Sequence, residues 1–263
     1  MDNRYLIDYY KNYNEDGRLT ESRHGQVEYL TTRKYIDAFA KKTDRLLEIG
    51  AGTGRYSVTL AKQGYDVTAV ELVESNLNIL RSKLDGSEKI ETFQGNALDL
   101  SFLESSSFDV TMLLGPMYHL YTQQEQVTAL KEAVRVTKPG GYILVAYCMN
   151  EATIIQYVFG CNSPGSIMEL HEISPEWKCI SQPQDLFQMM RLEDIDAVNA
   201  EVDAQRVKIV ATDGASRYVR DYLEKFDDDG FAKWLDYHFT TCERMDLIGA
   251  TNHSLDILRK KDT

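Results

Sequence analysis

The sequence lacks any apolar run near the roughly 20 residues that a membrane-spanning helix needs. Its amino terminus also lacks the basic and then apolar pattern of a secretory signal. Cysteine is scarce and scattered, without C-x-x-C spacing or clustered histidines, which disfavours a zinc site and suits reduced thiols. These absences predict a cytoplasmic protein with no membrane partner and no bound metal. The four cysteines are Cys148, Cys161, Cys179 and Cys242.

Basic stretches are also missing. The 263 residues include 41 Asp and Glu against 29 Lys and Arg, and the net charge of −12 comes without any run of basic residues. Proteins that bind nucleic acid usually present a basic patch, so we expect no nucleic-acid partner. The hydrophobic fraction of 43% argues against disorder. The length suits one large α/β domain with elaborations or two small domains, and nothing in the sequence indicates an oligomeric state.

The most informative stretch is Leu-Leu-Glu-Ile-Gly-Ala-Gly-Thr-Gly at residues 46–54. A short apolar run containing Glu48 leads into three glycines at alternate positions, and residues 55–63 then have the apolar spacing of a helix. Glycine permits positive φ and lets a ligand lie against the backbone, while the start of a helix offers unpaired N–H groups. The stretch therefore predicts a ligand-binding turn between a strand and a helix. The glycines are Gly50, Gly52 and Gly54.

The spacing of these glycines differs from the dinucleotide fingerprint G-x-G-x-x-G. Arg55 stands where that fingerprint needs its third glycine, and the sequence has no Tyr-x-x-x-Lys pair. Both observations disfavour a nicotinamide-dependent oxidoreductase, which remains an alternative. The motif instead reads E-x-G-x-G-x-G, which resembles the first motif of the class I S-adenosylmethionine (SAM)-dependent methyltransferases.

An acid follows the next predicted strand. Residues 66–70 form that strand, and it ends at Glu71, 17 positions after Gly54. A carboxylate about 20 residues beyond a glycine turn is placed to accept hydrogen bonds from two ribose hydroxyls. Leu72 follows, where an apolar side chain can lie against an adenine ring.

The third predicted strand, residues 90–94, is followed by Gly95-Asn96-Ala97. In methyltransferases that this chain resembles, the loop often reads Gly-Asp-Ala, and its acid or amide reaches the adenine amino group. The side-chain oxygen of Asn96 can also accept from that amine. The alternative is an ordinary turn, for which a Gly-Asn pair is common.

The fourth predicted strand, residues 108–114, is almost continuously apolar, as is typical of a parallel strand buried on both faces. It leads into Gly115-Pro116-Met117-Tyr118-His119-Leu120. Ligands of open α/β sheets bind outside the carboxyl ends of the strands, so this loop should face the reacting end of a cofactor. His119, with Tyr118 beside it, is the best-placed candidate for a catalytic base. The alternative is that both side chains only shape the loop.

The features together resemble class I SAM-dependent methyltransferases over roughly residues 44–147. A capping box at residues 122–125 opens a further helix, which we expect to end at Lys138-Pro139-Gly140-Gly141 before an apolar strand at 142–147. The Gly-Pro-x-Tyr-His-Leu loop looks like that of bacterial members with mostly unassigned substrates. The resemblance implies a Rossmann-like, doubly wound, mostly parallel seven-stranded α/β sheet with helices on both faces. It also implies SAM as the cofactor, with Glu48 at its amino end, Glu71 at the ribose, and further contacts from Gly50, Ala51, Gly52, Gly54, Leu72, Asn96, Ala97 and Leu114.

The remaining segments should form a helical cap. The fifth strand and a later one at 207–212, if parallel, end on the cofactor side, so the insertions after them should emerge beside the methyl group. We therefore expect a single domain, residues 1–263. Its core is about 43–147, 191–213 and 247–263, and its cap is 1–42, 148–190 and 214–246.

Several cap residues are candidates for substrate contact, with ordinary core packing as the alternative. In the first segment, Thr20 should begin a helix that runs to about residue 42. His253, near the last strand, is expected to be structural. The candidates are Tyr9, Tyr13, His24 and Glu28 in the first segment, and Phe159, Cys161, Met168, His171, Trp177, Phe187, Met189 and Met190 in the second.

The function that follows is methyl transfer from SAM by in-line displacement. Amino-methylating enzymes of nucleic acids often carry Asn-Pro-Pro-Tyr or Asp-Pro-Pro-Tyr after the fourth strand, and this chain has Gly-Pro-Met-Tyr there. The missing amide or acid and the acidic charge favour a small-molecule acceptor. A non-catalytic SAM-binding protein would show the same cofactor motifs and remains an alternative.

Overall fold

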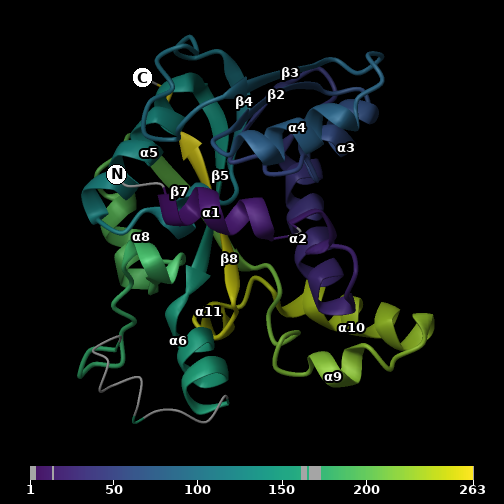
Figure 1. The fold of residues 1–263 in the computed structure, drawn as a ribbon, viewed down its shortest axis with the longest axis vertical. Helices are drawn as coiled ribbons and strands as arrows, with labels where there is room; N and C mark the ends of the chain where they lie inside the picture. Colours follow the sequence, from purple (N-terminus) through teal and green to yellow (C-terminus); the bar gives the residue numbers. More distant parts are fainter. Residues whose placement is uncertain (1–3, 14, 161–164, 166–172, 263) are drawn as a thin grey trace.

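The structure, a computed structural model, describes residues 4–13, 15–160, 165 and 173–262. Its centre is an open sheet with the strand order β3-β2-β1-β4-β5-β8-β7 (Figure 1). A two-residue strand, β6, pairs with β5 off this path. The strands are β1 (Arg45–Ile49), β2 (Asp66–Glu71), β3 (Ile90–Gln94), β4 (Phe108–Leu113), β5 (Thr137–Met149), β6 (Met189–Met190), β7 (Ala204–Ala211) and β8 (His253–Lys260).

The sheet is mostly parallel. Strands β1 to β5 pair in parallel, and β8 is antiparallel to both β5 and β7, so β7 runs in the same direction as β5. The expected doubly wound α/β fold with seven strands is confirmed, with one addition. β6 continues the sheet on the β4 side of β5, beyond the point where β4 has ended.

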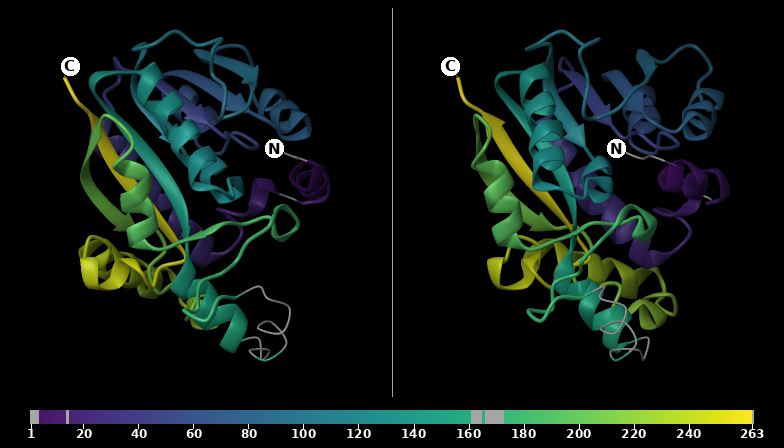
Figure 2. Two further views of the ribbon diagram at one scale, coloured as in Figure 1. Left: turned by 90° about the vertical axis from the view of Figure 1, so that its left-hand side faces the viewer. Right: turned by 60° about the vertical axis from the view of Figure 1, so that its left-hand side comes forward.

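Helices cover both faces of the sheet (Figure 2). None of those in the described part of the chain has the length and apolar character to cross a bilayer. The larger helices are α1 (Arg4–Asn12), α2 (Arg23–Phe39), α3 (Ser57–Lys62), α4 (Glu74–Ser82), α5 (Gln123–Val136), α8 (Leu192–Asn199) and α10 (Asp228–Thr241). Shorter turns are η1 (Glu15–Gly17), η2 (Pro116–His119), α6 (Asn150–Thr153), η3 (Ile154–Phe159), η4 (Pro183–Asp185), α9 (Arg220–Leu223) and α11 (Met245–Ile248).

Two helix boundaries differ from the sequence-based expectation. The capping box at α5 is present, because Thr122 accepts from the Glu125 N–H and the Glu125 carboxylate accepts from the Thr122 N–H, both at 3.2 Å. However, Lys138-Pro139-Gly140-Gly141 belongs to β5, which begins directly after the helix with an irregular register against β4. In α2 the N-cap is Ser22, whose hydroxyl accepts from the Gly25 N–H at 3.2 Å, so the prediction of Thr20 is wrong by two residues.

The core lies along the central strands. β1 and β4 place apolar side chains on both faces of the sheet, and Leu46, Leu47, Val110 and Met112 are all fully buried. This agrees with the near-continuous apolar runs in the sequence. Because the strand order reverses between β1 and β4, the glycine turn after β1 lies where open α/β sheets bind ligands.

Three segments outside the predicted core gather near that edge. α1 lies across the middle of the molecule and contacts α4 on one side and η4 on the other (Figure 1). The segment that follows β5, with α6, and the segment that follows β7, with α9 and α10, lie toward the same lower end of the view. The helices of the latter pack against α2.

Candidate functional site

A cavity of about 530 Å³ lies at the carboxyl ends of the parallel strands. Its size is within the range of small-molecule sites, about 300–1,000 Å³. The glycine turn, the ends of β2 and β3, η2 and α1 all contribute to its walls. Of the residues predicted to bind a cofactor, those that line it are Gly50, Gly52, Glu71, Leu72, Asn96, Ala97 and Leu114.

The glycines of the turn all have positive φ, but only at Gly52 would an added Cβ make no close contact. A Cβ at Gly50 would lie 2.5 Å from the Pro116 Cδ, and one at Gly54 would lie 2.6 Å from the Leu80 Cγ. These two glycines therefore allow their backbone to pack closely against Pro116 and Leu80. At Gly52 the nearest atom to an added Cβ is the Glu15 Cγ, 3.8 Å away. The backbone at Gly52 is thus open to a ligand.

Glu71 joins the glycine turn to the tip of β2. Its Oε2 accepts from the Gly52 N–H at 2.7 Å, and its Oε1 accepts from the Val73 N–H at 2.8 Å. Burial raises the pKa of the Glu71 carboxyl, while these two bonds act in the opposite direction. The side chain remains part of the cavity wall.

Asn96 lines the cavity and also forms the turn that was predicted from the Gly95-Asn96 pair. Its Oδ1 accepts from the Leu98 N–H at 3.0 Å, which fixes the direction of the side chain. A carboxamide oxygen has a second lone pair, and the amide NH₂ carries two donors. Contact with an adenine therefore stays a prediction for this residue.

Glu48 does not line the cavity. It is 2% exposed, and its carboxylate accepts from both the backbone N–H and the hydroxyl of Ser57 at the start of α3. Burial raises the pKa of Glu48 to about 8, against the effect of the Ser57 bonds. The expected contact with the amino end of SAM does not fit this placement, because α3 closes over the side chain. Ala51 and Gly54 also lie behind the wall.

His119 and Tyr118 both line the cavity. The Nδ1 of His119 lies 2.7 Å from the carbonyl oxygen of Leu186, which can only accept, so Nδ1 carries the proton. Its Nε2 lies 3.2 Å from the Tyr10 hydroxyl and accepts from it. Burial lowers the pKa of His119 to about 4, so the imidazole is neutral at pH 7. General-base action, which stays a prediction, requires Tyr10 to leave Nε2.

Two charged residues of the first segment line the cavity and were not predicted. Arg18 donates to Glu15 Oε1 at 2.9 Å and forms a bidentate pair with Glu28 at 2.9 and 3.1 Å. Glu15 and Arg18 face the cavity, as do Tyr9 and Tyr13, whereas His24 and Glu28 do not. No sequence motif identifies Glu15 or Arg18 as site residues. They form ion pairs and line the cavity only because the first segment folds back on itself.

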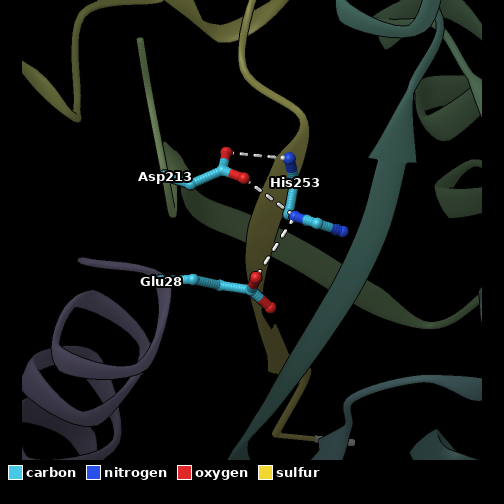
Figure 3. A group of neighbouring side chains, drawn as sticks. All are labelled: Glu28, Asp213 and His253. Atoms are coloured by element: carbon cyan, nitrogen blue, oxygen red, sulfur yellow. Dashed lines mark hydrogen bonds and ion pairs between the residues drawn. The ribbon is translucent and has the colours of Figure 1, made fainter. Parts of the chain in front are cut away.

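A buried charge network includes one cavity-lining residue, His253, and two carboxylates outside the lining, Glu28 and Asp213 (Figure 3). His253 Nδ1 lies 2.9 Å from Asp213 Oδ2 and 3.4 Å from Glu28 Oε2. Burial alone would lower the pKa of His253, but Glu28 and Asp213 outweigh it and raise the pKa to about 10. His253 is therefore an imidazolium at neutral pH, and it lines the cavity, although the sequence suggested only a structural role.

The same three side chains have the spacing of a possible metal site, with ligand atoms within 4.8 Å of one another. Their bonding favours an ion network instead. The Nδ1 of His253 donates to Asp213, so it cannot ligate, and both oxygens of Glu28 accept from Arg18. A guanidinium beside the group would also repel a dication.

The two later insertions contribute the rest of the wall. Arg217 donates from Nη1 to the Tyr157 hydroxyl at 3.2 Å, and its Nε lies 4.0 Å from Asp213 Oδ2. Of the candidates in the first insertion, Phe187 and Met189 line the cavity, together with Cys148, Thr153 and Tyr157, whereas Phe159, Trp177 and Met190 do not. Cys161, Met168 and His171 lie outside the described residues.

Comparisons with known proteins point to one family. Residues 47–145 match the family described as "Methyltransferase domain". The chain is 36% identical over 102 residues to the demethylmenaquinone methyltransferase of Clavibacter sepedonicus, covering 39% of this chain and 40% of that protein. It is 32% identical over 112 residues to the enzyme of that name in Staphylococcus aureus, covering 41% and 44%. The chain thus spans about half the length, or less, of the curated relatives it matches.

Solved structures extend the likeness to nearly the whole chain. A SAM-dependent methyltransferase of Methanosarcina mazei superposes with a TM-score of 0.59 and 17% identity, over 86% of this chain and 97% of that one. A Thermotoga maritima protein described as a SAM-dependent methyltransferase, possible histamine N-methyltransferase, has a TM-score of 0.58 and 19% identity, over 98% and 100%. At these identities the likeness establishes the fold.

Proposed function

We propose that this chain, whose residues 47–145 match the methyltransferase domain family, is an enzyme that methylates a small molecule with SAM. The observation that carries the proposal is the open backbone at Gly52, bonded to Glu71 at the carboxyl ends of β1 and β2. A side chain at Gly52 would fill this space, so the cradle fits an extended ligand that needs close approach to the backbone.

The cofactor would lie along the wall from β3 to the first segment. We expect the adenine beside Leu72, Asn96 and Ala97, the ribose at Glu71, and the methionine part over Gly50 and Gly52. These contacts agree with the resemblance to class I methyltransferases and with the residues that line the cavity.

The amino-acid end of the cofactor needs partners other than Glu48. Glu15 reaches toward Gly52, and Arg18 is bonded to Glu15. We propose that Glu15 accepts from the ammonium group and that Arg18 donates to the carboxylate. The pairing satisfies both charges of the zwitterion with groups that already line the cavity.

When bound, SAM supplies an activated methyl carbon and the positive charge that drives its transfer. The chain's own task is to hold the acceptor in line with that carbon, at roughly 3–3.5 Å, and to exclude water. η2 and the insertions enclose the space beyond the glycine turn. His119 is the residue that we propose to take a proton from the acceptor, once Tyr10 has released its Nε2.

A small acceptor agrees with the partly open, largely apolar cavity and with the acidic charge of the chain. Two related enzymes are named for demethylmenaquinone, also a small molecule. We propose that the chain is one domain, in which residues 1–42, 148–190 and 214–246 act as the cap over this space.

Two measurements test the proposal. Calorimetric titration should show binding of SAM and none of NAD, and binding of NAD alone would favour an oxidoreductase. Formation of S-adenosylhomocysteine with a metabolite pool should then follow, whereas SAM binding without turnover would indicate a non-catalytic protein.

The placement of Glu15 has its own test. Wild-type protein should bind S-adenosylhomocysteine more tightly than 5′-methylthioadenosine, which lacks the amino-acid part. Glu15→Gln should reduce this difference, and an unchanged difference would contradict the assignment. Asp8→Asn, an exposed carboxylate on α1, is the control.

A further inference from the structure

We propose that the acceptor is an organic acid, and that its carboxylate or phosphate group binds between Arg217 and His253. The inference rests on the proposed function, because it concerns the half of the cavity that the cofactor leaves open. It adds the chemical class of the acceptor, which the family does not specify.

The two cations converge on the same part of the wall. Arg217 comes from the insertion after β7, and His253 comes from the start of β8. Both approach Asp213 Oδ2, at 4.0 Å from the Arg217 Nε and 2.9 Å from the His253 Nδ1. Arg217 and His253 line the cavity, whereas Asp213 does not. The positive groups therefore face the ligand, and the carboxylate lies behind them.

Both cations have donors left for a ligand. In Figure 3 the Nε2 of His253 points away from Asp213 and Glu28, and among the residues that the structure describes it has no hydrogen-bond partner. Because the ring is an imidazolium, this nitrogen carries a proton. The Arg217 guanidinium has five N–H donors, and its hydrogen bond to Tyr157 uses one. Its distance to Asp213 is too long for a hydrogen bond.

The negative groups of the network are already satisfied. Asp213 Oδ1 accepts from the Thr251 hydroxyl at 2.6 Å and from the N–H groups of Asn252 and His253 at 3.0 Å. Both oxygens of Glu28 accept from Arg18. The carboxylate oxygens of Asp213 and Glu28 already accept charge-assisted or backbone hydrogen bonds. The free N–H donors of Arg217 and His253 are therefore the groups that an acid in the cavity would contact.

The surroundings indicate the rest of the acceptor. Tyr118, Phe187 and Met189 line the same cavity and present aromatic or apolar surface. A molecule with one acid group and an apolar or aromatic body matches this lining, because it pairs the charge and buries the remainder.

A competing explanation is that Arg217 holds the carboxylate of the cofactor. Glu15 lies beside Gly52 and Arg18 is bonded to Glu15, so we assign the cofactor carboxylate to Arg18. The two explanations differ in one measurable way. Loss of Arg217 should leave SAM affinity unchanged if it binds the acceptor, and should reduce it if it binds the cofactor.

The experiment uses the full chain with SAM and a panel of aromatic and aliphatic carboxylic acids and phosphate monoesters, each paired with its neutral amide or ester. Binding to the complex with S-adenosylhomocysteine and methyl transfer are both measured. The wild type should bind and methylate acids in preference to their neutral partners. Arg217→Gln should reduce kcat/KM for the acid roughly 10- to 100-fold, mainly through KM, with SAM affinity unchanged. Arg217→Lys should recover part of the loss.

Arg220→Gln is the matched control, since Arg220 is an exposed arginine on α9 outside the cavity. The inference would be overturned if the wild type used the acids and their neutral amides or esters equally well. It would also be overturned if the wild type bound SAM but neither bound nor methylated any of the acids. A fall in SAM affinity in Arg217→Gln would assign the residue to the cofactor instead. Absence of SAM binding in the wild type would be a failure of the proposed function itself.

Discussion

The backbone N–H of Gly52 donates to the carboxylate of Glu71 at 2.7 Å. This bond connects the turn after β1 with the tip of β2, which are 19 residues apart in sequence. The bond holds together two residues that the sequence analysis identified separately, Gly52 of the glycine turn and the acid Glu71. A ligand held by the carboxylate therefore also lies against the Gly52 backbone, and the two contacts are expected to depend on each other.

Glu71→Ala should weaken both SAM binding and the fold. It removes the acceptor for the ribose and leaves the Gly52 and Val73 N–H groups without their carboxylate partner. We expect a loss of about 1–3 kcal/mol in the free energy of unfolding and of roughly 10- to 100-fold in SAM affinity. Urea unfolding and calorimetry measure the two effects. Glu74→Ala, an exposed acid at the start of α4, is the control. Unchanged SAM affinity in Glu71→Ala would count against the ribose assignment.

Gly52→Ala should fold and lose SAM affinity. Its φ of +55° costs an alanine about 1–2 kcal/mol, and the added methyl group enters the cavity without a clash. Gly64→Ala is a matched control, because its φ is +89°, an added Cβ there meets nothing within 4 Å, and it lies away from the cavity. Both variants should lose similar stability in thermal unfolding. A SAM affinity that falls equally in both would show that backbone strain, and not occupancy of the cavity, is responsible.

Glu48→Gln should stabilise the protein at alkaline pH. The folded-state pKa of about 8 lies above the ordinary value of 4.5, so the folded protein holds a proton that the unfolded chain releases. The wild type therefore loses stability as the pH rises from about 4.5 to 8, by a few kcal/mol at most. Glutamine mimics the neutral carboxyl and keeps an acceptor for Ser57. Thermal unfolding from pH 5 to 9 measures the difference, which should grow with pH. Because Glu48 does not line the cavity, SAM affinity should stay the same.

His119→Ala should lower kcat by roughly 100-fold if His119 is the base, with little change in SAM affinity. Since its pKa is about 4, the imidazole is neutral from pH 5 upward, and kcat should show no inflection from His119 near pH 6.5. Tyr10→Phe is the control for loss of the hydrogen bond between Tyr10 and His119, because it removes the hydroxyl that contacts Nε2 and keeps the aromatic ring. If SAM affinity falls and kcat does not, His119 serves to link α1 to the loop at Leu186.

Much of the fold could be predicted because the sequence patterns that indicate its strands, turns and helix starts each lie within a few neighbouring residues. The apolar runs of β1 and β4, the glycines after β1 and the Thr122 capping box each lie within one element, and all were found where expected. Boundaries were less certain where neighbouring residues offer similar chemistry. Thr20 and Ser22 can both cap a helix, and in the structure Ser22 does so.

The composition of the cavity wall was decided by tertiary structure. The sequence by itself determined the apolar runs of β1 and β4, the glycine turn and the acid at Glu71, because hydrophobic periodicity and glycine spacing report contacts within a few residues. It could not indicate that α3 closes over Glu48, or that Arg18, Arg217 and His253 line one cavity. Arg18, Arg217 and His253 lie up to 235 positions apart, and such distant pairings depend on how the helices and insertions pack around the sheet, for which spacing along the chain carries no signal.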